Sequence, residues 1–265
     1  MLNYKDQLGN VIQLAKKPLR IISVVPSQSE FLWDIGLRDE LVGITKFCIH
    51  PKEMRVSKAR VGGTKKLNLK KIRELKPDLI IGNKEENDQF QIEELQKEFP
   101  VWMSDIYTFQ DAFKMMEGLG ILLNKEPETM QVVNELKMSF LRIQAILKTQ
   151  KVAYFIWNKP YMFAAKNTFI DHVLNYLGLE NALSYYERYP ELDETALKRI
   201  NPDLCFLSSE PFRFKEIHVD ELKKLLPNSK ILIVDGEMFS WYGTRLLFLE
   251  KYVQDLINSL REAKR

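Results

Sequence analysis

The stretch Ile72-Arg-Glu-Leu-Lys-Pro-Asp-Leu-Ile-Ile-Gly-Asn-Lys-Glu85 decides the fold, because a later stretch of the same chain repeats its pattern. Leu197-Lys-Arg-Ile-Asn-Pro-Asp-Leu-Cys-Phe-Leu-Ser-Ser-Glu210 aligns on it without gaps, at an offset of 125 residues (202 − 77 for the two prolines). Self-similarity at a fixed spacing indicates a structural unit that is built more than once. We therefore predict two similar lobes.

Each copy of the repeat predicts a helix, a turn and a buried strand. Two apolar residues at helical spacing are followed by a proline, which cannot continue a helix. The apolar runs at residues 79–81 and 204–206 are continuous, which is typical of strands covered on both faces in a parallel sheet. Residues 83–87 and 208–213 then lie at the carboxyl ends of these strands, where open α/β sheets place ligand-binding loops.

The rest of the chain alternates in the same way. A weaker echo links residues 31–39 to residues 173–181, each an amphipathic helix that we expect Gly36 and Gly178 to cap. Gly62-Gly63-Thr64 predicts a tight turn. Strands that alternate with helices predict mainly parallel sheets. The further predicted strands are residues 20–25, 41–45, 100–103, 151–156 and 231–234.

One long helix is predicted between the two halves. Apolar residues recur at a spacing of three and four, which places a single seam along a helix; they are Val133, Leu136, Phe140, Ile143 and Leu147. From residue 127 to residue 150 such a helix would span roughly 36 Å and would resist hinge bending. The predicted architecture is α/β: two Rossmann-like lobes at residues 1–125 and 151–265, a connecting helix at 126–150, and a ligand cleft between the lobes.

Composition excludes several classes of protein. The chain of 265 residues suits two domains, and 45% hydrophobic with 28% charged residues is ordinary for a globular protein. The net charge of +3 comes from 39 basic and 36 acidic residues spread along the chain, so we expect no nucleic-acid partner. Cys48 and Cys205 fall in different predicted lobes, which argues against a disulfide. The start of the sequence lacks the apolar stretch of a signal peptide, which keeps a cytoplasmic location as an alternative.

Several phrases, in order, resemble one known family. They are Asp6-Gln-Leu-Gly-Asn10, the segment 20–32, Val61-Gly-Gly-Thr64, Leu75-Lys-Pro-Asp-Leu-Ile-Ile81 and the segment 235–247. Together they resemble the helical-backbone periplasmic solute-binding proteins of ABC importers for vitamin B12, haem and ferric siderophores. The vitamin B12-binding branch is the most similar, with matches at Asn87 and at residues 235–239. The chain departs from that branch at residues 84–86 and 46–50.

The resemblance implies a function without chemistry. It implies the substrate-binding component of an ABC importer, periplasmic and monomeric, that captures cobalamin or a related metal chelate, with haem or a ferric siderophore as the alternative ligand. No cofactor is required for that role. The partner is the importer's permease, which family members contact through an acidic residue on each lobe. In this chain Glu85, Glu86 and Glu210 occupy equivalent loops of the two halves.

The loops expected at the cleft supply the candidate ligand-binding residues. A planar chelate calls for aromatic faces and a few polar anchors. Phe47, Trp157 and Phe239 suit a packed core equally well, whereas the Phe-Ser-Trp-Tyr run before a helix cannot bury all its rings on one face. Lys84, Arg213 and Arg245 are alternatives for facing an anionic ligand. The predicted set is Ser27, Gln28, Phe47, Cys48, His50, Lys84, Glu85, Asn87, Trp157, Phe212, Phe239, Trp241 and Tyr242.

Metal binding and catalysis find less support in the sequence. Cys48 and His50 are suitable metal ligands, but no Cys-x-x-Cys or His-Glu-x-x-His spacing accompanies them. We therefore predict no direct metal site, with His50 as a weak candidate for an axial ligand to a macrocyclic metal. Gly-x-Ser-x-Gly and the phosphate-binding glycine motifs are missing too. The alternatives that stay open are a metal-cofactor enzyme of nitrogenase-like or chelatase-like fold, and a cytosolic sensor or carrier.

Overall fold

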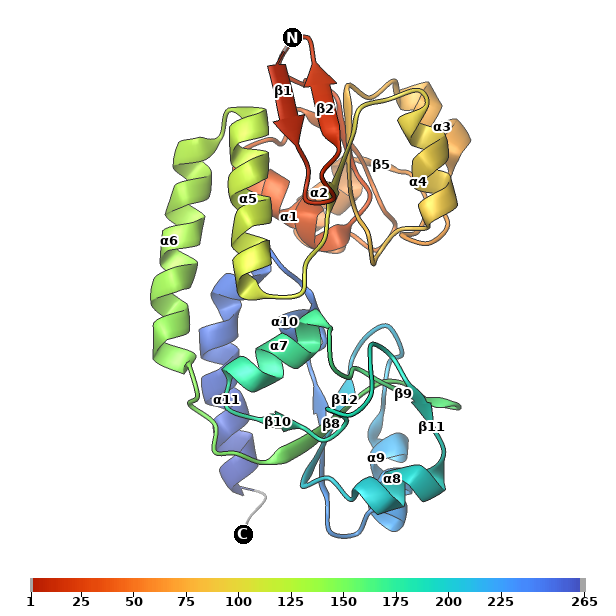
Figure 1. Ribbon diagram of the computed structural model, residues 1–265, viewed down its shortest axis with the longest axis vertical. Coiled ribbons are helices and arrows are strands. Elements are labelled where there is room, and N and C mark those ends of the chain that lie inside the picture. Colours follow the sequence, from red (N-terminus) through yellow and green to blue (C-terminus); the bar gives the residue numbers. More distant parts are fainter. Residues whose placement is uncertain (1, 263–265) are drawn as a thin grey trace. The chain divides into compact units, whose positions relative to one another are not determined.

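A computed structural model describes residues 2–262, and the chain divides into two compact units (Figure 1). The first unit runs from the start of the chain to Ile106 and adds Gln110–Leu136 and Tyr242–Leu246. The second unit takes Tyr107–Phe109, Lys137–Trp241 and the chain from Leu247 onward. The polypeptide therefore passes from one unit to the other more than once, and a short segment near its end returns to the first unit.

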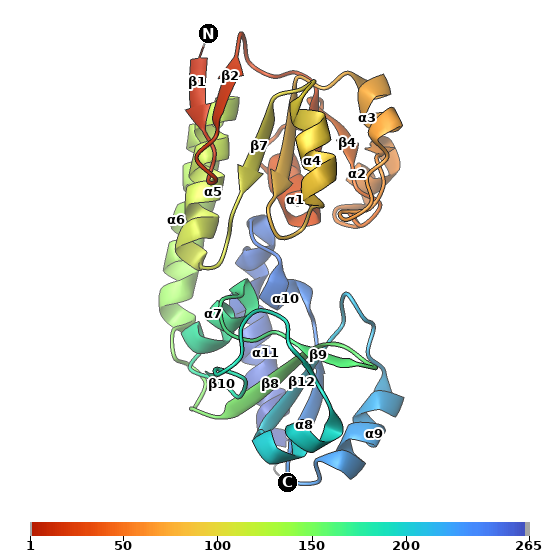
Figure 2. The ribbon, with the colours of Figure 1, turned by 45° about the vertical axis from the view of Figure 1, so that its right-hand side comes forward.

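The first unit contains a five-stranded sheet in the order β5-β4-β3-β6-β7, with every neighbouring pair parallel. The chain starts at the central strand, adds two strands on one side and then two on the other, which is the doubly wound order. Figure 2 shows α3 and α4 beside this sheet, and their side chains pack with those of β3, β6 and β7 in one apolar cluster. The strands are β3 (Ile21–Ser23), β4 (Leu41–Ile44), β5 (Ala59–Arg60), β6 (Leu79–Asn83) and β7 (Val101–Ser104), preceded by the antiparallel hairpin β1 (Leu2–Lys5) and β2 (Val11–Leu14). The helices are α1 (Pro26–Asp34), α2 (Lys52–Ser57), α3 (Leu69–Leu75), α4 (Gln89–Gln96) and most of α5 (Phe109–Leu123).

The second unit is built around a sheet in the order β11-β9-β8-β12-β13, with β10 also paired to β8. Strands β8, β12 and β13 are parallel, whereas β9 runs antiparallel to both β8 and β11. The prediction of mainly parallel α/β sheets is confirmed, but the antiparallel edge was not foreseen. The strands are β8 (Lys151–Trp157), β9 (Tyr161–Phe163), β10 (Glu180–Asn181), β11 (Glu191–Leu192), β12 (Leu204–Ser208) and β13 (Lys230–Val234). The helices are α7 (Phe169–Tyr176), α8 (Glu194–Ile200), α9 (Glu216–Leu225), α10 (Glu237–Ser240) and α11 (Leu249–Glu262). A 3₁₀ turn, η1 (Thr244–Phe248), starts in the first unit and ends in the second.

The sequence repeat is a repeat of structure. Asn68 and Asp193, which are 125 residues apart (193 − 68), cap α3 and α8 by accepting the backbone N–H three residues later, at 2.9 and 2.7 Å. Lys76 and Asn201, at the same offset (201 − 76), end these helices in the left-handed conformation with φ of 46°. The predicted helix, turn and strand are confirmed in both copies.

The aspartate of each Pro-Asp pair ties its turn to the neighbouring strand. Asp78 Oδ2 accepts the backbone N–H groups of Leu19 (2.9 Å) and Arg20 (3.2 Å), at the start of β3. Asp203 Oδ2 accepts the N–H of Lys151 (2.8 Å), the first residue of β8. These N–H groups lie at the exposed starts of the two strands, where a side chain or water can accept their hydrogen bonds. The aspartate thus joins the repeated turn to the central strand of each sheet.

The connecting helix is shorter than its apolar seam predicts. Helix α6 spans Glu126–Ile143 rather than ending at residue 150. Past its end, Ala145 has a left-handed φ of 49°, and its N–H donates to the carbonyl of Tyr176 (2.8 Å). The N–H of Leu147 donates to the carbonyl of Leu177 (2.9 Å). Backbone bonds to the end of α7 therefore replace the last turns of the predicted helix.

The predicted glycine positions are confirmed. Gly36 and Gly178 follow α1 and α7 with φ of 85° and 95°, the left-handed conformation in which glycine closes a helix. Gly63 and Lys66 exchange two backbone hydrogen bonds, which makes the tight turn expected there. The two cysteines are both buried, lie in different units and form no disulfide.

A buried ion pair holds the segment Tyr242–Leu246 in the first unit. The guanidinium of Arg245 contacts both carboxylate oxygens of Glu30 on α1, with Nε 3.0 Å from Oε2. The side chains are 13% and 8% exposed. Thr244 donates a hydrogen bond to Asp34, one turn further along α1. Burial raises the pKa of both carboxyl groups, and the neighbouring guanidinium opposes that rise.

We predict that Arg245→Ala lowers the free energy of unfolding by about 3–5 kcal/mol, because it leaves the Glu30 carboxylate buried without its partner. Chemical denaturation followed by circular dichroism measures the loss. Arg142→Ala is the matched control, because Arg142 makes the same two-pronged contact with Glu250 on an exposed surface. Equal losses in the two variants would contradict the structural role of the buried pair.

Candidate ligand-binding site

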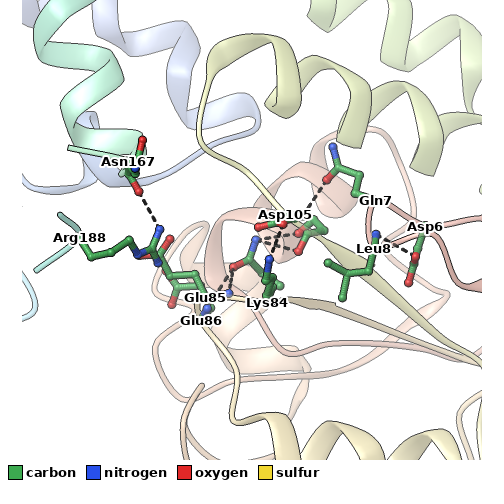
Figure 3. Close-up of polar contacts among 11 residues, drawn as sticks. Asp6, Gln7, Leu8, Lys84, Glu85, Glu86, Asp105, Asn167 and Arg188 are labelled. Carbon is green, nitrogen blue, oxygen red and sulfur yellow. Dashed lines mark hydrogen bonds and ion pairs between the residues drawn. The ribbon is translucent and has the colours of Figure 1, made fainter. Parts of the chain in front are cut away.

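The loop after β6 is built around Asn83. Its Oδ1 accepts the backbone N–H groups of Glu85 (2.8 Å) and Glu86 (3.0 Å), and its Nδ2 donates to Ser104 Oγ (2.9 Å) at the end of β7. Both glutamates are partly exposed (Figure 3). The carboxyl ends of β6 and β7 are thus linked, and Glu85 and Glu86 project from a fixed turn.

The buried side chain of Asn87 holds the same loop in place by hydrogen bonds. Its Oδ1 accepts the N–H of Asn83 (2.8 Å), and its Nδ2 donates to the carbonyls of Val24 (3.0 Å) and Thr64 (3.2 Å). The side chain is buried, and its amide joins three loops at the carboxyl edge of the sheet. Contact of Asn87 with a ligand stays a prediction.

Lys84 forms an ion pair in this loop. Its Nζ lies 2.8 Å from Asp105 Oδ2, just past the end of β7, and the N–H of Asp105 donates to Gln7 Oε1 (3.1 Å) (Figure 3). An exposed pair of this kind contributes little to stability. The positive charge of Lys84, proposed from the sequence to face an anion, is opposed at short range by a carboxylate.

The first turn of α1 presents a buried amide. Gln28 is 0% exposed, and its Nε2 donates to Ser104 Oγ (2.5 Å). Within residues 2–262 its Oε1 has no hydrogen-bond partner. Buried polar atoms are nearly always hydrogen-bonded, so this oxygen is the strongest candidate on α1 for contact with a polar group of a ligand. Ser27 lies beside it and is also buried.

The predicted residues 47–50 divide between surface and interior. Phe47 is half exposed, and Lys46 Nζ lies 5.0 Å from its ring centroid. The Cys48 thiol is buried and hydrogen-bonds Ser29 and Thr45, each at 3.3 Å. Burial raises its pKa, which keeps the thiol protonated and a poor metal ligand. In the described chain no three His, Cys, Asp or Glu side chains gather in a way that could hold a metal ion.

An aromatic cluster lies at the carboxyl ends of β8 and β12. Trp157 ends β8 with 40% of its surface exposed, and its ring meets that of Phe212 edge-on, with centroids 5.4 Å apart. Phe212 in turn contacts Phe214 (4.9 Å) and His218 (5.3 Å). Trp157 and Phe212, predicted separately from the sequence, are thus brought together at the edge where α/β sheets bind ligands. That this cluster shares one cleft with the loops of the first unit stays a prediction.

The run 239–242 is more buried than the sequence suggests. Phe239, Trp241 and Tyr242 are 0%, 7% and 4% exposed. Helix α10 ends at Ser240, and Trp241 is extended with φ of −90° and ψ of 131°, so the rings leave the backbone in different directions. Phe239 packs on Tyr154 in the second unit, with centroids 5.3 Å apart, whereas Tyr242 belongs to the first unit. The sequence predicted that one face of a helix could not bury all these rings; they are buried nonetheless, because the run leaves the helix after Ser240.

Glu210 turns towards α10. Its Oε1 accepts hydrogen bonds from Ser240 Oγ and Trp241 Nε1, each at 2.8 Å. Burial raises the pKa of this carboxyl, and the negative charges of Glu237 and Asp235 raise it further. The hydrogen bonds from Ser240 and Trp241 oppose that rise. The carboxylate proposed for permease docking is therefore engaged within its own unit.

The sequence reasoning missed a cationic site around Arg188. Its guanidinium carbon lies 5.4 Å from the ring centroid of Tyr107 and 5.5 Å from that of Tyr189. Its Nη1 donates to the carbonyl of Asn167 (2.7 Å) (Figure 3). The backbone at Arg188 is left-handed, with φ of 61°, a conformation that costs energy for a non-glycine residue. The run Tyr185-Tyr-Glu-Arg-Tyr189 was the available signal, since arginine stacks on aromatic rings.

Comparison with known proteins identifies the class. Residues 21–225 match the family of periplasmic binding proteins, and the chain belongs to that family. An ABC transporter substrate-binding lipoprotein of Bacillus subtilis, YvrC, is 27% identical over 271 residues, which cover 96% of this chain and 84% of that one. A vitamin B12-binding protein of Vibrio parahaemolyticus is 26% identical over 204 residues, 74% of each chain.

Solved structures share the fold over nearly the whole chain. A possible iron-binding, periplasmic solute-binding protein of Staphylococcus epidermidis has a TM-score of 0.76, with 23% identity and coverage of 91% of this chain and 99% of that one. The vitamin B12-binding protein BtuF of Vibrio cholerae has a TM-score of 0.72, with 21% identity and coverage of 94% and 98%. The siderophore-binding protein BauB has a TM-score of 0.78, with 19% identity and coverage of 96% and 97%.

The protein is a solute-binding protein of the ABC-transporter type and not an enzyme. The metal-cofactor enzyme that the sequence left open is thereby set aside. Within residues 2–262, no helix is long and apolar enough to cross a membrane.

We predict that Glu210→Gln stabilises the protein at neutral pH, and that this stabilisation increases with pH. Folding raises the pKa of the Glu210 carboxyl, so its protonated form stabilises the folded protein. This contribution is fully present at any pH below the pKa that Glu210 has in the unfolded chain. That contribution is lost as pH rises through the folded pKa. Glutamine keeps the accepting oxygen without the charge. The difference in unfolding free energy between variant and wild type, measured by denaturation from pH 4 to 8, should therefore grow with pH, and a constant difference would refute this assignment.

Proposed function

We propose that this protein captures a metal chelate, namely cobalamin, haem or a ferric siderophore, and delivers it to the permease of an ABC importer. The observation that carries the proposal is the partly exposed aromatic pair of Trp157 and Phe212 at the carboxyl ends of β8 and β12. Large planar chelates bind to aromatic faces. Relatives and structural neighbours whose names specify vitamin B12, haem and siderophores support the same class of ligand.

The proposed contact surfaces are the loops at the carboxyl ends of the strands in each unit. In the second unit the Trp157 cluster lies at such ends, and we add Arg188, on the segment before β11. In the first unit they are Phe47, Gln28 with Ser27, and the Asn83 turn that carries Lys84 and Glu85. Residues packed within a unit, such as Cys48 and Phe239, support these surfaces from behind.

Arg188 favours an anionic chelate among the three ligands. The guanidinium is held by two tyrosine rings and a backbone carbonyl, so little side-chain freedom is lost when it meets an anion. Haem carries propionates and many ferric siderophores carry net negative charge, whereas the periphery of cobalamin is mainly amides. Haem or a ferric siderophore is therefore the preferred ligand.

The proposed partner is a permease, and the proposed place of work is the outer side of the cytoplasmic membrane. The names of the relatives, a substrate-binding lipoprotein and periplasmic binding proteins, support both. Glu85 and Glu86 are the proposed docking carboxylates of the first unit, because the Asn83 turn fixes their backbone and both side chains are partly exposed. We expect a monomer.

Equilibrium titration with haemin, ferric enterobactin, ferrichrome and cyanocobalamin, followed by tryptophan fluorescence, tests the ligand class. We expect saturable one-to-one binding of at least one iron chelate. Trp157→Ala should weaken that binding about tenfold or more, which corresponds to about 1.4 kcal/mol. Phe90→Ala is the control, since Phe90 is an exposed aromatic side chain on α4, away from the carboxyl-end loops. Silence across all four ligands would refute the ligand class.

The Arg188→Gln substitution tests whether Arg188 contributes to the binding of anionic chelates but not of neutral ones. We expect it to weaken binding of haemin or ferric enterobactin at least about tenfold and to flatten the salt dependence of that affinity. Binding of cyanocobalamin, where present, should be unchanged. Arg199→Gln, which removes an exposed charge from α8 in the same unit, is the control for net charge. Equal effects of the two substitutions would contradict a specific role for Arg188.

A further inference from the structure

One carboxylate joins the loop after β12 to α10. Glu210 Oε1 accepts from Ser240, the last residue of α10, and from the indole of Trp241, the next residue. Two donors on one oxygen fix both the carboxylate and the plane of the indole ring. The loop backbone is held as well, because Ser208 Oγ accepts the N–H of Glu210 (3.3 Å).

Glu210 packs so close to Gly236 that no larger residue fits at position 236. A Cβ at this glycine would lie 2.7 Å from Glu210 Cγ, which is closer than real side chains approach. The N–H of Gly236 donates to Ser209 Oγ (2.9 Å), so a second bond holds the two loops together beside the carboxylate. Glu210 is therefore tightly packed between the β12 loop and α10.

The same loop carries part of the aromatic cluster. Phe212 follows Glu210 by two residues and packs on Trp157. We infer that Glu210 is a positioning residue: by locking the β12 loop onto α10 through Ser240 and Trp241, it sets Phe212 against Trp157. The inference deepens the proposed function and rests on it for the link to ligand binding.

The hydrogen bonds that Glu210 accepts from Ser240 and Trp241 depend on its protonation state. The charged and titratable groups that face Glu210 are Glu237 on α10, Asp235 before that helix, and Tyr154 on β8, whose neighbour Tyr252 lies on α11. An ionised carboxylate accepts hydrogen bonds more strongly than a protonated one. The raised pKa of Glu210 therefore loosens the lock at a higher pH than an ordinary glutamate would. Ligand affinity should therefore decrease as the pH is lowered through the pKa of Glu210.

Indole N–H signals report on the lock directly. The chain has four tryptophans, so ¹⁵N-tryptophan labelling of the whole protein gives four indole signals, and Trp241→Phe assigns one of them. We expect the Trp241 signal to shift with pH, with a midpoint above about 4.3, the usual glutamate pKa. Glu210→Gln should abolish this titration yet keep the signal close to its neutral-pH position, whereas Glu210→Ala should displace it. A Trp241 signal that does not titrate, or that is the same in both variants, overturns the inference.

Affinity measurements then test the link to the aromatic cluster. With the chelate that binds among haemin, ferric enterobactin, ferrichrome and cyanocobalamin, Glu210→Ala should weaken binding about tenfold at pH 7, and Glu210→Gln should restore it to within about threefold of wild type. The double variant Glu210→Ala, Phe212→Ala should lose no more than Phe212→Ala alone, because both changes remove the same contact. Trp241→Phe removes the indole donor by a milder change, and should weaken binding in the same direction.

The two proposals fail separately. If none of the four chelates binds, the proposed function fails, while the indole titration still decides whether Glu210 holds Trp241. If Trp157→Ala weakens binding but Glu210→Ala and Trp241→Phe do not, the proposed function stands and the positioning role of Glu210 is wrong.

Discussion

Each sheet depends on one aspartate that accepts backbone N–H groups at the start of its central strand. Parallel strands leave polar groups at their ends that the ladder does not pair, so each needs a side-chain or water partner. Asp78 supplies that partner for the segment leading into β3, and Asp203 supplies it for β8. The proline before each aspartate stops the preceding helix, and the aspartate then joins the turn to the neighbouring strand. The same helix, turn and strand, joined in this way to a central strand, occur twice at an offset of 125 residues (203 − 78).

The two copies diverge where their strands end. Asn83 gathers the N–H groups of Glu85 and Glu86, which leaves both carboxylates on the surface. At the matching position Ser208 holds the backbone of Glu210, and the Glu210 side chain turns inward to Ser240 and Trp241. Equivalent glutamates are all partly exposed, but the Glu210 side chain is held by hydrogen bonds from Ser240 and Trp241.

The arrangement suits binding rather than chemistry. The buried Glu30 is paired with Arg245, and Asp34 and Glu210, which are not fully buried, accept hydrogen bonds from Thr244 and Trp241. The Cys48 thiol, the most reactive side chain in the predicted set, is buried and protonated. What the loops offer instead is a partly exposed tryptophan at the end of β8 and, before β11, an arginine stacked on two tyrosines. Such groups provide surface and charge, which is what a solute-binding protein needs from its loops.

The sequence by itself determined the repeated unit, the principal parallel strands, the glycine caps and the family. Those features follow from short-range patterns, since apolar period, proline and glycine act within a few residues. Tertiary structure decided the features that depend on distant partners. Helix α6 ends early because the backbone around Ala145 bonds to the end of α7, and β9 and β11 add an antiparallel edge. The burial of Trp241, the inward turn of Glu210 and the stacking of Arg188 on Tyr107 join residues up to 81 positions apart (188 − 107), beyond what any local pattern records.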